Sequence, residues 1–86
     1  MSGLDDLVRD AQRAGLPEPV SVGPKSRWFD GYVRLKSAAD FTAYHRYGFV
    51  EPWGNAVPVA GRIYQAVELL AGGRVVVSWP AGDDTP

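Results

Sequence analysis

Cysteine is absent from this chain of 86 residues, and histidine occurs once, at position 45. Without thiols the protein forms no disulfide, and one imidazole cannot supply the four nitrogen or sulfur ligands of a structural zinc site. Residues 1–10 lack the basic and apolar parts of a secretory signal, and no apolar run approaches the ~20 residues of a membrane span. We therefore expect a soluble cytoplasmic protein without metal, cofactor or membrane contact, which hydrophobic burial alone stabilises.

Sequence motifs of phosphate-binding loops and of nucleophilic hydrolases are also missing. Neither G-x-G-x-x-G nor G-x-x-x-x-G-K occurs, and no serine stands in a G-x-S-x-G context. The net charge is only −1, which argues against a protein whose affinity comes from neutralising many phosphates. These absences favour a binding function over nucleotide or acyl-transfer chemistry.

What the chain does contain is a dense group of aromatic side chains and a local excess of positive charge. Residues 25–46 carry five basic and two acidic residues, and seven of the nine basic residues of the chain are arginines. The arginine bias, with abundant alanine, valine and glycine, is typical of a GC-rich bacterial or phage gene. Eight of the ten aromatic residues fall within 28–53, a stretch that we expect to supply both core and binding surface: Trp28, Phe29, Tyr32, Phe41, Tyr44, Tyr47, Phe49 and Trp53.

Residues 3–14 have the spacing and the end signals of an amphipathic helix. Apolar side chains recur at helical intervals after a capping box that begins at Ser2. Gly15 is the residue type that ends a helix in the left-handed conformation, and Pro17 prevents continuation. The sequence therefore predicts a first helix over 3–14.

Residues 38–47 repeat these signals in a shorter segment. Ser37 is the expected N-cap, because its hydroxyl can accept a hydrogen bond from a free amide of the first turn. Gly48 is the expected left-handed stop, with Tyr44 and Phe49 as the contact pair of a Schellman motif. The sequence predicts a second, short helix here.

Residues 28–36 are predicted to form a β-hairpin, preceded by a short strand at 20–22. The Asp30-Gly31 dipeptide suits a type I′ turn, which would place Arg27 opposite Arg34. In the second strand apolar residues alternate with side chains that face away from the core, namely Tyr32, Arg34 and Lys36.

Part of the C-terminal half is compatible with two kinds of secondary structure. A turn is expected over 51–55. Residues 62–70 match a helical stripe, yet Gly72-Gly73 leads directly into a β-branched run at 74–79. We favour a β-hairpin of 62–70 with 74–79 and keep a helix at 62–70 as the alternative.

Together these elements indicate an α+β fold. It consists of an N-terminal helix, a small mostly antiparallel sheet of four or five strands, and a second short helix packed on one face. One globular domain is expected over 1–80, with a flexible tail at 81–86. The predicted core is Leu4, Leu7, Val8, Trp28, Val33, Leu35, Phe41, Tyr44, Ile63, Val67, Val75 and Val77.

The outward side chains of the 28–36 hairpin are the leading candidates for function, and we assign no catalytic residue. Tyrosine, tryptophan and arginine are common interface anchors. Two arginines opposite each other on paired strands repel, which a binding partner would offset. The candidate partner-binding residues are therefore Arg27, Tyr32, Arg34, Lys36, Tyr47 and Trp53; a merely solvated face is the simpler alternative.

Three functions follow from these candidates. The first is a small non-enzymatic module, a regulator, inhibitor or adaptor that docks on another protein. The second is a nucleic-acid-binding regulator, because aromatic rings stack on bases and arginines contact phosphates. The third is a small ribonuclease-like toxin, which requires His45, Glu51 and one arginine to converge in one pocket. The simpler interpretation of His45 is an interfacial residue of a short helix.

Overall fold

The computed structural model describes residues 3–82 and shows two helices and six strands. In chain order these are α1 (Gly3–Arg13), β1 (Ser21–Gly23), β2 (Tyr32–Arg34), α2 (Ala38–Arg46), β3 (Val50–Pro52), β4 (Val57–Val59), β5 (Arg62–Leu69) and β6 (Arg74–Pro80). The sheet is mostly antiparallel, so the α+β class is confirmed, with one strand more than the five expected at most. Residues 83–86 of the predicted tail and Ser2 of the predicted capping box lie outside the described residues.

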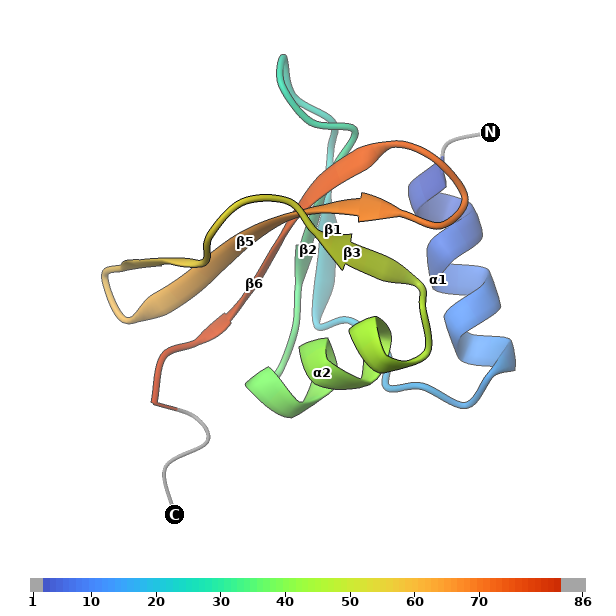
Figure 1. Ribbon diagram of the computed structural model, residues 1–86, viewed down its shortest axis with the longest axis horizontal. Coiled ribbons are helices and arrows are strands. Elements are labelled where there is room, and N and C mark those ends of the chain that lie inside the picture. Colours follow the sequence, from blue (N-terminus) through green and yellow to red (C-terminus); the bar gives the residue numbers. More distant parts are fainter. Residues whose placement is uncertain (1–2, 83–86) are drawn as a thin grey trace.

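The order of strands in the sheet is β1-β2-β6-β5-β3, and β4 also pairs with β5 (Figure 1). β2 and β6 run parallel, whereas the other pairs are antiparallel. Parallel neighbours need a long connection, and here the connection contains α2, β3, β4 and β5. The last strand, β6, therefore lies inside the sheet, between β2 and β5.

The β5–β6 hairpin is the longest pairing in the sheet, with seven residue pairs in register. Its turn contains Gly72 and Gly73, whose φ angles of +99° and +100° are rarely adopted by other residues. Burial alternates in β5, where Gln65, Val67 and Leu69 are buried between more exposed neighbours. The strand prediction for 62–70 is therefore confirmed, and the helix alternative is wrong.

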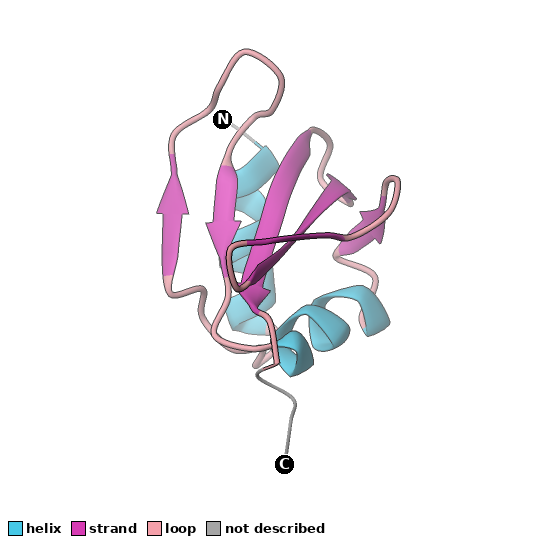
Figure 2. Ribbon diagram, turned by 90° about the vertical axis from the view of Figure 1, so that its left-hand side faces the viewer, coloured by secondary structure: helices cyan, strands magenta, loops and turns pink. Residues whose placement is uncertain are grey.

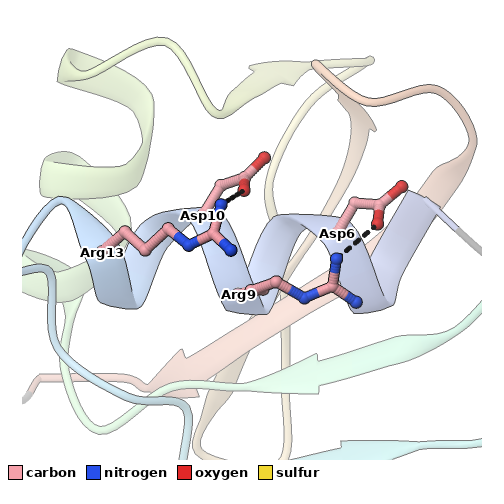
Figure 3. Close-up of polar contacts among 4 residues, drawn as sticks. All are labelled: Asp6, Arg9, Asp10 and Arg13. Atoms are coloured by element: carbon pink, nitrogen blue, oxygen red, sulfur yellow. Dashed lines mark hydrogen bonds and ion pairs between the residues drawn. The ribbon is translucent and has the colours of Figure 1, made fainter.

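Helix α1 presents one apolar face and one charged face. Leu4, Leu7 and Ala11 are buried against the sheet. On the solvent side Arg9 pairs with Asp6 and Arg13 with Asp10, at N–O distances of 3.5 and 3.8 Å (Figure 3). The helix ends one residue before the predicted end, and neither helix of the described residues is long and apolar enough to cross a membrane.

Helix α2 has the two caps that the sequence predicts. The Ser37 hydroxyl accepts from the Asp40 amide over 3.4 Å. At the other end the Phe49 amide donates to the Tyr44 carbonyl and the Gly48 amide to the His45 carbonyl, both over 3.0 Å, which is the bonding of a Schellman motif. The helix ends at Arg46, because Tyr47 is already the C-cap.

The predicted hairpin at 28–36 is wrong, because β2 pairs with β1 instead. Residues 24–31 form a loop between these strands, which projects from the sheet in Figures 1 and 2. Neither Asp30 nor Gly31 has the positive φ of a type I′ turn. The Asp30 carboxylate instead accepts from the Arg74 amide over 2.8 Å, and a Cβ on Gly31 would collide with the Leu4 side chain. The dipeptide thus anchors the loop to β6 and lets α1 approach.

The turn predicted at 51–55 is displaced toward its C-terminal end. Glu51 and Pro52 belong to β3 and pair with β5, and the Trp53 amide still donates to the Ala66 carbonyl over 2.7 Å. The chain changes direction around Gly54, which has a φ of +88°.

Side chains from both helices pack together on one face of the sheet. In Figure 2 the sheet lies in front of α1. Of the predicted core, Trp28 is wrong, since it is 74% exposed in the 24–31 loop. Val8, Phe41 and Ile63 are partly buried at the edge of the core. Four buried hydrophobic residues were not predicted: Ala11, Val50, Leu69 and Trp79.

Candidate interaction surface

The face of the sheet that points away from the helices carries the candidate site. Successive side chains of a strand point to opposite faces, so in β6 Val75 and Val77 point toward the helices and Ser78 points away. The register then assigns the neighbouring strands. We call this surface the open face and define it by its side chains: Tyr32, Arg34, Glu51, Trp53, Val57, Val59, Arg62, Tyr64, Ala66, Glu68, Arg74, Val76 and Ser78.

Five of these side chains form a hydroxyl–arginine cluster at Ser78. The Tyr32 hydroxyl and Ser78 Oγ are hydrogen-bonded over 2.8 Å, and Arg62 Nη2 donates to Ser78 Oγ over 3.1 Å. The Arg34 guanidinium lies 5.9 Å from the centre of the Tyr32 ring. The Tyr64 ring stacks on Tyr32 with centroids 6.4 Å apart. Ser78 is fully buried beneath these contacts.

The cluster makes the environment of the Tyr32 hydroxyl positive. Burial raises the pKa of the phenol, but hydrogen bonds with Ser78 and Arg34, the charge of Arg34 and a hydrogen bond with Tyr64 outweigh it. The net pKa of Tyr32 is lowered from its ordinary value of 10.0. The site therefore favours negative charge where the hydroxyl groups meet.

A second contact between an arginine and an aromatic ring lies at the other end of the open face. The Arg74 guanidinium stands 3.9 Å above the centre of the Trp53 ring, and the ring stays 47% exposed. Arg74 Nε is buried without a hydrogen-bond acceptor among the described residues. Glu68 is opposite both Arg74 and Glu51, which brings two carboxylates to this end.

The arginines of the open face differ from those of α1 in their partners. Arg9 and Arg13 each form an ion pair with an aspartate of the same helix (Figure 3). Within residues 3–82, no ion pair joins Arg34, Arg62 or Arg74 to a carboxylate. These three cations lie against aromatic rings and a hydroxyl instead, so their charge is available to a partner.

Of the six predicted binding residues, the structure brings Tyr32, Arg34 and Trp53 onto the open face. Lys36 is exposed but follows the end of β2, and Tyr47 is 63% exposed at the C-cap of α2.

Arg27 lies in the 24–31 loop with its guanidinium 5.2 Å from the centre of the Trp28 ring. Its predicted position opposite Arg34 is wrong, because Ser21 occupies that position. The expected repulsion between the two arginines therefore does not exist.

Sequence reasoning missed the part of the open face contributed by β5 and β6. Arg62 and Tyr64 belong to the segment 62–70, whose secondary structure was ambiguous, and Arg74 and Ser78 belong to the strand predicted at 74–79. A two-residue turn at Gly72-Gly73 would pair Tyr64 with Ala81. In the structure the turn begins earlier, so that Glu68 pairs with Arg74 and Tyr64 with Ser78. The turn signal alone therefore did not give this neighbour.

His45 lies outside the open face and forms a surface pair. Its Nε2 atom is 3.9 Å from Glu51 Oε2, and both side chains are substantially exposed. The convergence with an arginine in one pocket that a ribonuclease-like site needs is not seen among the described residues.

The interior offers no space for a ligand at its best-formed cavity. This void measures about 10 Å³, at most the space of a single water molecule. Its lining is entirely apolar except for one tyrosine: Leu7, Val33, Leu35, Phe41, Tyr44, Val50 and Val77. Among residues 3–82, no group of three carboxylate or imidazole side chains is placed to hold a metal ion.

Comparison with known proteins gives no match, since neither a family model, nor a curated protein, nor a solved structure is similar to this chain.

Proposed function

We propose that this protein is a non-enzymatic binding module that docks its open face on another protein. The observation that carries the proposal is the pairing of partly exposed aromatic rings with arginines that have no carboxylate partner among the described residues. Tryptophan, tyrosine and arginine are the residue types that contribute most binding energy at interfaces.

The composition of the open face also indicates the chemistry of the partner. Arg34, Arg62 and Arg74 are held by ring and hydroxyl contacts, so little side-chain freedom remains to be lost on binding. Ala66 and Val76 supply a small apolar floor between Trp53 and Tyr32. A partner that fits has an apolar centre and acidic side chains at its rim.

Nucleic-acid binding is the second candidate, because arginines and aromatic rings share one face. Two observations favour a protein partner instead. Glu51 and Glu68 place negative charge beside Trp53, and the net charge of the chain is −1. With only three cations on the open face, duplex affinity should fall with salt at a log–log slope of about −0.9 for each neutralised phosphate.

Affinity capture from lysate of the source organism tests the proposal. The wild-type chain is compared with Trp53→Ala/Arg74→Ala, and Arg9→Ala/Arg13→Ala serves as a control that also carries two substitutions and removes arginines elsewhere. We expect one protein to be captured by the wild type and the control after nuclease treatment, and to be lost with the open-face variant. Equal capture by all three, or loss of the bound material after nuclease, would contradict the proposal.

A further inference from the structure

The hydroxyl–arginine cluster has the donor arrangement of an oxyanion site. Two guanidinium groups, Arg34 and Arg62, and the hydroxyls of Tyr32, Tyr64 and Ser78 lie together on three adjacent strands. Arginine is donor-only, so these groups present more donors than acceptors to whatever binds there.

Part of this donor capacity is unused within the protein. Arg62 donates from Nη2 to Ser78, whereas its Nε is buried without an acceptor among residues 3–82. Because this Nε is shielded from solvent, an incoming anion would meet the terminal nitrogens of the Arg62 guanidinium. Arg34 is exposed and lies against the opposite side of the cluster, at Tyr32.

The charge of the cluster distinguishes between classes of anion. Two cations without a neighbouring carboxylate in the described chain leave a charge of +2 on the site. A carboxylate or a phosphodiester carries one negative charge, whereas a phosphate monoester carries about −1.5 to −2 at neutral pH and three acceptor oxygens. The monoester is the closest match in charge and in number of acceptors.

We propose that the hydroxyl–arginine cluster binds the phosphate monoester of a phosphorylated side chain on the partner protein. This inference rests on the proposed docking of the open face. The phosphoryl oxygens accept from Arg34 and Arg62 on the two sides of the Tyr32 hydroxyl, and the buried Ser78 hydroxyl holds Tyr32 and Arg62 from below.

Titration of the full chain with inorganic phosphate tests the site without the partner. Chloride at matched ionic strength is the control. Both titrations use the full chain, so the carboxylates of Asp83 and Asp84 are present in every sample. We expect saturable changes in the amide resonances of Tyr32 and Ser78. The same titration should raise the pKa of Tyr32, seen as phenolate absorbance that is missing in Tyr32→Phe, because a bound anion opposes loss of the proton.

Substitutions then locate the site. Arg34→Ala should weaken phosphate binding at least tenfold, because it removes charge-assisted hydrogen bonds. Arg34 is exposed, so this variant keeps the fold. Arg9→Ala/Arg13→Ala should bind phosphate as the wild type does. Absence of saturation in the wild type, or equal weakening in both variants, would overturn the inference.

A phosphatase arm separates this inference from the proposed function. Capture of the partner from phosphatase-treated lysate should fall at least tenfold, by the same loss of charge-assisted bonds. If capture is unchanged and still depends on Trp53 and Arg74, docking stands and the phosphoryl ligand is wrong. If phosphate binds at the cluster but no protein is captured by the open face, the proposed function is wrong and the anion site remains.

Discussion

The two faces of the sheet are made by the same strands and differ in what holds their side chains. On the covered face Val33, Val67 and Val75 are almost completely buried beneath the helices. On the open face Arg34 and Arg74 lie over tyrosine and tryptophan rings that remain partly exposed. The covered face therefore forms the core, whereas the open face keeps charged and aromatic side chains partly accessible to solvent.

The pKa values of two tyrosines, one on each side of the sheet, also differ in direction. Burial, with the negative charges of Asp40 and Glu18, raises the pKa of Tyr44 to about 12, and its hydroxyl donates to the Pro17 carbonyl over 2.6 Å. The pKa of Tyr32 on the open face is lowered instead, by contacts that outweigh burial. The surroundings of Tyr44 therefore disfavour a phenolate, whereas those of Tyr32 favour one.

The largest difference is expected between two adjacent residues, Leu35 and Arg34. Leu35→Ala opens a cavity in the core and should cost about 2–5 kcal/mol of unfolding free energy. Arg34→Ala should change it by no more than about 0.5 kcal/mol. Thermal unfolding gives both values, since each kcal/mol corresponds to about 4–8 °C at this chain length. Equal losses would mean that the open face is part of the core.

Alkaline pH should affect the two tyrosines in opposite directions. Tyr44 keeps its proton in the folded state up to about pH 12, whereas the unfolded chain loses it near pH 10. This group therefore lowers stability as pH rises from 10 to 12, by on the order of 2 kcal/mol. Tyr32 is deprotonated more easily when folded, so it contributes stability that increases as pH rises toward 10.

Urea unfolding at a series of pH values measures both effects. In Tyr44→Phe the free energy of unfolding should no longer fall above pH 10. In Tyr32→Phe it should no longer rise at lower pH. At neutral pH Tyr44→Phe should itself cost about 1 kcal/mol, because the bond to Pro17 is lost. Identical slopes for the two variants would contradict the assignment of the faces.

A smaller effect is expected for the contact between Trp53 and Arg74. A double-mutant cycle with Trp53→Ala and Arg74→Gln should give a coupling energy of about 0.5–1 kcal/mol, as for exposed cation–π pairs. A coupling of zero would mean that Arg74 is not held in place before binding.

The smallest effect belongs to the ion pairs of α1. Arg9→Gln and Arg13→Gln remove exposed pairs three residues apart, which contribute less than about 0.5 kcal/mol. The melting temperatures should match that of the wild type within error. A large loss would disqualify Arg9→Ala/Arg13→Ala, which removes the same ion pairs, as the control for the open face.

The sequence predicted the elements whose signals are local. The caps of α2 lie within a few residues of the helix, so Ser37 and Gly48 marked its ends correctly. The hairpin turn at Gly72-Gly73 was found for the same reason, since glycine pairs favour the positive φ that both residues adopt.

Strand pairing over long separations could not be predicted in this way. Asp30-Gly31 fits a tight turn by itself, but its conformation is decided by the bond from the Arg74 amide, 44 residues later. The predicted positions of Arg27 and Trp28 both depended on that turn, so both predictions were wrong. The open face needed the register of β5 on β6, which brought Arg62 and Tyr64 to Ser78.

Arginine-specific labelling tests most directly whether the open face is the binding surface. The chain is treated with phenylglyoxal when free and when bound to the captured protein, and modification at each arginine is measured by mass spectrometry. We expect protection of Arg34, Arg62 and Arg74 in the bound state, with Arg9 and Arg13 modified equally in both. Protection of the α1 arginines, or unchanged modification of Arg34, would contradict binding through the open face.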